Sequence, residues 1–126
     1  MNARCMAAVA VAFASGSVAM DAAAQAGAKF PAKTIRIIVP YPASGPTDLT
    51  ARTIAPHMSQ ALGQSIIMDN RAGGSTIIGT ELVAKSPPDG HTLLMVTSTV
   101  SINPSVFKKL PYDTVRDLAP VTIVIS

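Results

Sequence analysis

Several residue types that stabilise or equip small proteins are scarce in this sequence. Of its 126 residues, one is cysteine, none is tryptophan and only 13% are charged. A single cysteine excludes an internal disulfide framework and a multi-cysteine metal site. The ten basic residues form no stripe interleaved with aromatic residues, so we expect no nucleic-acid partner. At 48% hydrophobic residues, the chain is too apolar for disorder and long enough for at most one small domain.

An export signal is predicted at residues 1–26. Arg4 supplies a positive charge, a short apolar run covers residues 6–14, and Ala-Gln-Ala at residues 24–26 fits a cleavage site. An earlier cut after Ala19 is an alternative. A buried helix or a membrane span is another reading, but the apolar run is shorter than the roughly 18 residues that a span needs. Cys5 precedes this run and would be removed with the signal, and an exported chain without cysteine points to the bacterial periplasm.

Strand and helix patterns alternate after the signal. Runs of β-branched and apolar residues predict strands at residues 34–40, 65–69, 92–97 and 121–125. Helical spacing predicts a helix from Thr47 to Leu62, a second over residues 77–85, a short third helix opening at Asn103 and a turn at residues 113–118. This alternation predicts an α/β fold with a parallel sheet and right-handed crossovers.

Local signals refine the expected helices. Thr47 is predicted to cap the first helix, Pro56 to kink or split it, and Gly63 to end it. Asn103 is predicted to cap the third helix, with Pro104 as its first residue. The predicted apolar faces of the first two helices comprise Leu49, Ile54, Met58 and Leu62, and Ile78, Leu82 and Val83.

Three loops follow the predicted parallel strands and should therefore share one edge of the sheet. We call them the first rim segment (residues 41–48), the second rim segment (residues 70–76) and the third rim segment (residues 97–103). They are rich in glycine, serine and threonine and precede helices, whose free backbone N–H groups attract anions. They predict a carboxylate or phosphate cradle. The alternative is that the glycines serve turns and the hydroxyls cap helices.

No catalytic residue, metal site or cofactor is predicted. Ser44 lacks the preceding glycine of a nucleophile elbow, His57 and His91 have no nearby carboxylate partner in sequence, and neither phosphate-loop motif is present. Two charged residues have open roles. Asp48 either serves the helix dipole or receives a ligand ammonium or hydroxyl, and Arg71 either pairs with a ligand carboxylate or lies on the surface.

These segments resemble the substrate-binding proteins of tripartite tricarboxylate transporters, also called the Bug family of periplasmic receptors. The resemblance rests on IRIIVPYPASGPTD with ARTIAPHMSQALGQ, DNRAGG with IIGTELVAK, SPPDGHTLLM, and INPSVFKKLPYD with VRDLAPVT. It implies a type II periplasmic binding protein, in which two α/β domains close on a small carboxylate and deliver it to inner-membrane permease subunits. Residues 27–126 would then be the incomplete first domain.

The resemblance also implies which residues bind the ligand. They come from the three rim segments and are Tyr41, Ser44, Gly45, Thr47, Asp48, Gly73, Gly74, Ser75, Thr76, Thr97, Ser98 and Asn103. The sequence departs from the family where Ser44 replaces a glycine, where Ser75, Thr76 and Ile77 replace a denser glycine run, and where His91 replaces an aromatic residue. Without a second domain, we expect weak carboxylate binding or none. The alternatives are an α/β enzyme using the same rim and a non-functional gene remnant.

Overall fold

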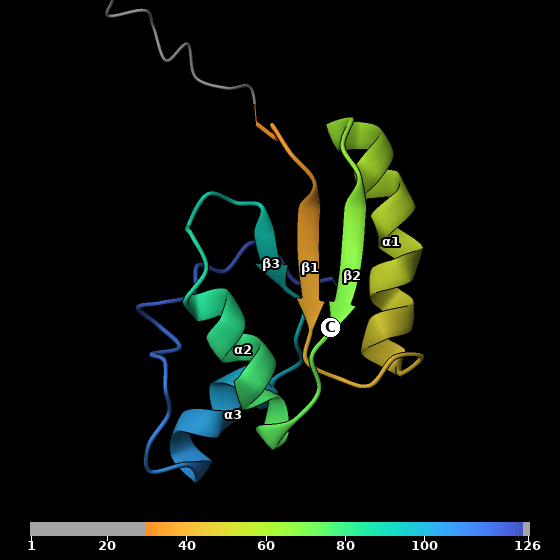
Figure 1. The fold of residues 1–126 in the computed structure, drawn as a ribbon. Helices are drawn as coiled ribbons and strands as arrows, with labels where there is room; N and C mark the ends of the chain where they lie inside the picture. The colour runs from red at the N-terminus through yellow and green to blue at the C-terminus, as the bar shows by residue number, and fades with distance from the viewer. Residues whose placement is uncertain (1–29, 125–126) are drawn as a thin grey trace, which may run out of the picture.

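The computed structural model of the protein describes residues 30–124, and the predicted signal with Cys5 lies outside them. The elements, shown in Figure 1, are β1 (Ile35–Val39), α1 (Pro46–Leu62), β2 (Ile66–Asn70), the 3-10 turn η1 (Gly74–Thr76), α2 (Ile77–Ala84), β3 (Thr92–Leu94) and α3 (Thr99–Val106). The three strands form a parallel sheet in the order β2-β1-β3. The predicted α/β class with a parallel sheet is confirmed.

Strand β1 is the centre of the sheet because it is nearly all β-branched and can be buried on both faces. Ile35, Ile38 and Val39 are at most 1% exposed. Ile37 lies opposite Met68 of β2 and Leu93 of β3 in the two parallel ladders. The sheet therefore builds outward from one strand that is buried at every position except Arg36.

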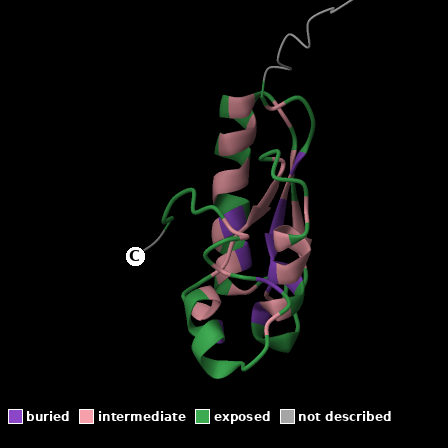
Figure 2. Cartoon of the chain, turned by 90° about the vertical axis from the view of Figure 1, so that its left-hand side faces the viewer, coloured by how far each residue is buried: buried purple, intermediate pink, exposed green. Residues whose placement is uncertain are grey.

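Helices cover both faces of the sheet. On one face, Ala51 and Met58 of α1 pack with Ile37 and Val39 of β1. Figure 2, which views the sheet nearly edge-on, shows the buried residues gathered along the sheet and on the adjoining turns of the helices. Leu49, which we expected on the buried face of α1, is 55% exposed. The packed face of α1 instead passes through Ala51, which lets the helix lie close to β1.

Helix α2 meets the opposite face through small residues rather than through its predicted apolar face. Ile78 is 54% exposed, whereas Gly79 and Thr80 are buried. A Cβ on Gly79 would lie 2.8 Å from Cβ of Pro40 and 3.0 Å from the backbone oxygen of Arg71. The absence of a side chain at Gly79 allows α2 to approach the ends of β1 and β2 this closely.

Two helix starts differ from prediction. Helix α1 begins at Pro46 with Gly45 as its N-cap, not at Thr47, because proline is well suited to the first helical position. Helix α3 begins at Thr99, so Asn103 and Pro104 lie inside it and Asn103 is no cap. Pro56 does not split α1, and Gly63 ends that helix as predicted, with φ of 65°.

The C-terminal part also differs from prediction. The turn near residues 113–118 is present, closed by a hydrogen bond from the N–H of Asp117 to the backbone oxygen of Asp113 at 2.9 Å. The fourth strand is absent from residues 121–124, where Val121 and Ile123 are 79% and 81% exposed. These residues have strand-forming side chains, but no described strand edge pairs with them. Within residues 30–124, no helix is both long and apolar enough to cross a bilayer.

The packing of α2 predicts that Gly79→Ala destabilises the protein. The new methyl group would meet a proline ring and a backbone oxygen, neither of which moves easily, so we expect the free energy of unfolding to fall by about 1–3 kcal/mol. Urea denaturation followed by circular dichroism measures this change. Gly63→Ala is the control: no atom lies within 4 Å of a Cβ there, and only the left-handed backbone opposes it, at about 1 kcal/mol. An equal or smaller loss for Gly79→Ala would contradict the close approach.

Candidate functional site at the carboxyl ends of the strands

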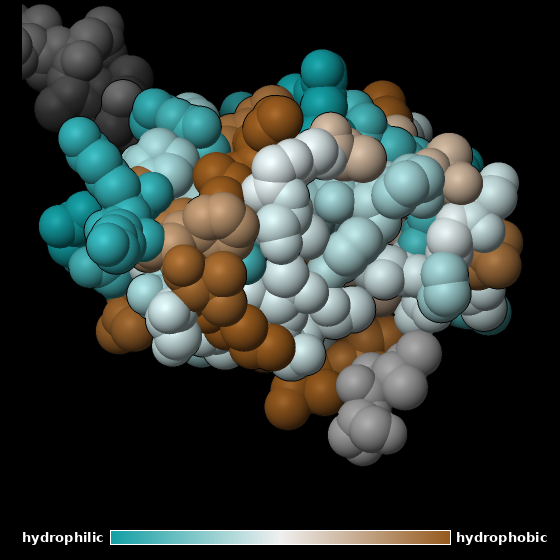
Figure 3. Space-filling view, turned by 90° about the horizontal axis from the view of Figure 1, so that it is seen from below, coloured by the Kyte–Doolittle hydropathy of each residue, from teal (hydrophilic) through white to brown (hydrophobic). Residues whose placement is uncertain are grey.

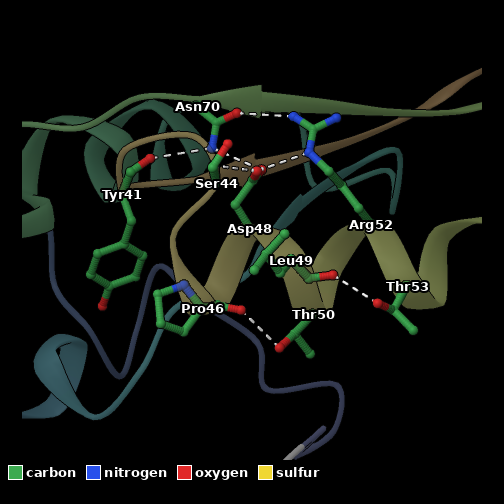
Figure 4. Close-up of polar contacts among 9 residues, drawn as sticks. All are labelled: Tyr41, Ser44, Pro46, Asp48, Leu49, Thr50, Arg52, Thr53 and Asn70. Carbon is green, nitrogen blue, oxygen red and sulfur yellow. Dashed lines mark hydrogen bonds and ion pairs between the residues drawn. The ribbon is translucent and has the colours of Figure 1, made fainter.

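The buried carboxylate of Asp48 joins three segments of the site. Asp48 is 1% exposed. Its Oδ2 accepts hydrogen bonds from the backbone N–H of Ser44 and from Nε of Arg52, both at 2.8 Å, and its Oδ1 accepts one from Nδ2 of Asn70 at 3.0 Å. Figure 4 shows these donors converging from the first rim segment, from α1 and from the end of β2. The arrangement satisfies the need of a buried charge for partners.

The same contacts set the charge state of Asp48. The hydrogen bond from Arg52, followed by those from Ser44 and Asn70, lowers the pKa of Asp48 to about 2. The carboxylate is therefore ionised at neutral pH and balanced by the guanidinium of Arg52. Asp48 lies in the first turn of α1, and its three described hydrogen bonds all come from protein donors.

Hydroxyl groups connect the first and third rim segments. Oη of Tyr41 lies 2.7 Å from Oγ1 of Thr97 and donates to Oγ1 of Thr99 at 3.3 Å. The two threonine oxygens are 3.0 Å apart, and the backbone N–H of Thr97 donates to Oη of Tyr41 at 3.3 Å. We call Tyr41, Thr97 and Thr99 the hydroxyl cluster. It places several hydrogen-bond donors and acceptors together on the rim.

The second rim segment has an unusual backbone. The φ angles of Gly73, Gly74, Ser75 and Thr76 are all positive, at 136°, 53°, 53° and 73°. Gly73, Gly74 and Ser75 are exposed, and within residues 30–124 their backbone N–H groups donate to no side chain and to no backbone oxygen outside η1. Three adjacent donors are thus available to an anion from solvent.

Asn103 joins the third rim segment to the second. It is 2% exposed, and its Nδ2 donates to the backbone oxygen of Ser75 at 2.9 Å and to Oγ1 of Thr76 at 3.3 Å. Asn70 makes the remaining connection, from its Nδ2 to the backbone oxygen of Tyr41 at 3.2 Å. All three rim segments therefore meet at one edge of the sheet, as predicted.

The rim face has moderate polarity. Figure 3, seen from below the strand ends, shows a pale central area between hydrophobic patches. Thr47 and Ser98 line a hollow of about 1850 Å³ between α1, β3 and residues 114–124, which Thr97 of the hydroxyl cluster also lines. Gly45 packs as the N-cap of α1. The predicted residues thus divide between the rim and this neighbouring hollow.

Arg52, Asn70 and Thr99 are partners in this site that were not predicted from the sequence. The spacing of four residues between Asp48 and Arg52 is a known signal for an ion pair on a helix. Thr99 and Asn70 carry no comparable signal. Arg71 lies on the surface and pairs with Asp69 through Nε and Oδ1 at 2.9 Å. Burial raises the pKa of Asp69, but hydrogen bonds from Arg36 and Arg71 outweigh it and leave that pKa below its ordinary value.

The acidic and histidine residues of the described part of the chain form no cluster suited to a metal ion. No group of three histidine, cysteine, aspartate or glutamate residues in residues 30–124 is placed to hold a metal ion. His91 packs edge-on against Phe30, with ring centroids 5.1 Å apart. Its Nδ1 is 3.4 Å from Oδ1 of Asp89, only two residues earlier, so the expectation that His91 has no nearby carboxylate was wrong. It lies at the start of β3, at the opposite end of the strands from the rim.

The Asp48 network predicts a pH-dependent effect of Asp48→Asn on stability. The folded-state pKa of about 2 lies below the value of about 3.9 for an unfolded aspartate. The stabilisation is therefore complete above about pH 4 and is lost as the pH falls towards 2. We expect Asp48→Asn to lower the urea midpoint at pH 7, and the difference from the parent chain to shrink as the pH falls from 4 towards 2.

Glu81→Gln is the matched control, because it removes an exposed ion pair with Lys85 at the same spacing on a helix. Exposed pairs of this kind contribute at most about 0.5 kcal/mol, so its urea midpoint should stay close to that of the parent chain. Equal midpoints for Asp48→Asn and the parent chain at pH 7 would contradict the network.

Curated relatives extend well beyond this chain. The chain is 42% identical over 94 residues to the UPF0065 protein in the tcbD-tcbE intergenic region of Pseudomonas sp. strain P51, covering 75% of this chain and 28% of that protein. It is 41% identical over 97 residues to protein BugT of Bordetella pertussis, covering 75% and 30%. The chain thus spans less than a third of the length of these relatives.

Solved structures agree with the fold. The periplasmic binding protein BugD matches with a TM-score of 0.65 at 35% identity, covering 68% of this chain and 28% of that structure. MatC of Rhodopseudomonas palustris with bound malate matches with a TM-score of 0.65 at 38% identity, covering 70% and 30%. Rpa4515 of R. palustris with adipate matches with a TM-score of 0.64 at 36% identity, covering 68% and 29%.

The family resemblance drawn from the sequence motifs is confirmed by a direct match. The family model described as "Tripartite tricarboxylate transporter family receptor" matches residues 50–126, which is more than half of the chain. This chain belongs to the tripartite tricarboxylate transporter receptor family.

Proposed function

We propose that this chain forms one ligand-binding side of a periplasmic receptor that captures a small dicarboxylate or tricarboxylate and delivers it to membrane permease subunits. The observation that carries the proposal is the second rim segment, where three consecutive exposed residues, Gly73, Gly74 and Ser75, have positive φ angles. Family membership supports the receptor role. The predicted signal at residues 1–26 supports export to the periplasm.

The chemistry of the rim favours a carboxylate over a cation. Asp48 is the only acidic residue in the three rim segments, and Arg52 balances its charge. The groups available to a ligand are backbone N–H donors and the hydroxyl cluster, which hydrogen-bond a carboxylate oxygen without a fixed cation. We assign ligand contact to Gly73, Gly74 and Ser75 first, and to the hydroxyl cluster second.

Bound carboxylates in two solved relatives support this ligand class. One relative holds malate and the other holds adipate, and both share the fold of this chain. Malate and adipate differ in length but both end in carboxylates. A rim that anchors one carboxylate through backbone donors suits such a range of ligands, and the proposal involves no catalytic step.

Titration with succinate tests the proposal. We expect succinate to shift the backbone amide resonances of Gly73, Gly74 and Ser75 in ¹H–¹⁵N spectra of the 126-residue chain. Because a single lobe covers only one side of a ligand, whereas binding pockets usually bury most of it, we expect the affinity to be in the millimolar range. Succinamide, which has the same length but no charge, is the control ligand. Equal shifts with both compounds, or none at tens of millimolar succinate, would contradict carboxylate binding.

The hydroxyl cluster gives a second prediction. Tyr41→Phe keeps the ring but removes the hydroxyl that contacts Thr97 and Thr99, so we expect the Kd for succinate to rise about fivefold, as for the loss of one net hydrogen bond. Thr53→Val is the matched control because its hydroxyl bonds only within α1, to the backbone oxygen of Leu49. Unchanged affinity in Tyr41→Phe would remove the hydroxyl cluster from the ligand contacts.

A further inference from the structure

We infer that Asn103 is a positioning residue of the proposed carboxylate site: it fixes the backbone of the second rim segment and does not touch the ligand. The part of the inference that concerns ligand affinity rests on the proposed function. The structural part, that the Asn103 amide holds the backbone at Ser75 and Thr76, stands on the contacts in this chain.

The second rim segment needs an external hold because its backbone is strained. Ser75 has φ of 53° and Thr76 has φ of 73°. Positive φ is uncommon for residues other than glycine and is a genuine outlier for β-branched threonine. Such conformations persist where the surrounding structure fixes them, and they gather at ligand-binding loops.

Asn103 makes the contacts that hold these two residues. Its side-chain amide has two hydrogens, and one bonds the backbone oxygen of Ser75 while the other bonds Oγ1 of Thr76. Oγ1 of Thr80 adds a bond from α2 to the backbone oxygen of Thr76 at 2.9 Å. At 2% exposure, with both donors in use, Asn103 presents no free N–H group to a ligand.

The burial of an amide at this position needs an explanation beyond packing. An apolar side chain of similar size would pack α3 against the loop without the cost of removing polar atoms from water. The amide provides instead two directed donors on the strained residues. The Asn103 amide therefore acts by fixing the geometry of the loop, which an apolar side chain could not do.

Helix α3 connects the second rim segment to the hydroxyl cluster. It begins at Thr99, a member of the hydroxyl cluster that contacts Tyr41 of the first rim segment. One turn further along the same helix, Asn103 contacts the second rim segment. The short helix thus fixes the spacing between the hydroxyl cluster and the backbone donors.

The first experiment compares the loop in two variants of the full chain without ligand. Asn103→Leu keeps approximate size but removes both donors, and Asn103→Ser is the milder variant if the leucine form does not fold. Ile35→Val is the control, because Ile35 is 1% exposed at the opposite end of β1 and its truncation also destabilises the core. We expect the amide resonances of Gly73 and Gly74 to move in the Asn103 variants and to stay in place in Ile35→Val.

The second experiment repeats the succinate titration on the same variants. We expect the Kd to rise at least about fivefold for the Asn103 variants, the effect of one net hydrogen bond, and to stay unchanged for Ile35→Val. Unmoved glycine resonances in the Asn103 variants would overturn the inference, as would an equal loss of affinity in Ile35→Val. A parent chain that does not respond to succinate would refute the proposed function, while the first experiment would still decide whether Asn103 positions the loop.

Discussion

The rim of this protein depends on one buried negative charge. A carboxylate that is 1% exposed at Asp48 is tolerable only because Ser44, Arg52 and Asn70 bring donors to it from three different segments. Each donor is fixed in return. Ser44 is held with φ of 67°, and Asn70 is held where it also reaches the backbone oxygen of Tyr41. Removing the charge would release the first rim segment, the start of α1 and the end of β2 together.

Close backbone approach is the second condition for the site. The second rim segment turns from β2 into α2 within a few residues, so α2 must lie against the strand ends. Gly79 makes this possible, since any side chain there would meet Pro40 and the backbone of Arg71. The position of α2 and the left-handed turn that precedes it are therefore linked, and Gly73, Gly74 and Ser75 of this turn are exposed.

The sequence was informative where local pattern and tertiary packing agree. The β-branched run of β1 predicts a buried central strand, and the parallel order then places the three rim segments at one edge. It was misleading where a local preference competes with a contact made elsewhere. Asn103 is a residue type that often caps helices. Its amide instead donates hydrogen bonds to Ser75 and Thr76, and α3 begins four residues earlier, at Thr99. Positive φ at Ser75 and Thr76 is unpredictable from residue type because distant side chains hold these residues. The segment at residues 121–124 has strand composition but no strand partner among the described residues.

The aspartate within this proposed anion site does not oppose anion binding, because its own charge is balanced by the protein. The Asp48 carboxylate accepts from Arg52, Ser44 and Asn70, so its charge is matched by a guanidinium and its oxygens are occupied by protein donors. A ligand at the rim would meet mainly backbone N–H groups and hydroxyls, which bind an anion through directed hydrogen bonds rather than through a fixed cation. Their directions must then be accurate, because no strong point charge compensates for a misplaced donor. This requirement gives a reason for the hydrogen bonds by which Asp48, Asn70 and Asn103 hold the rim segments from behind.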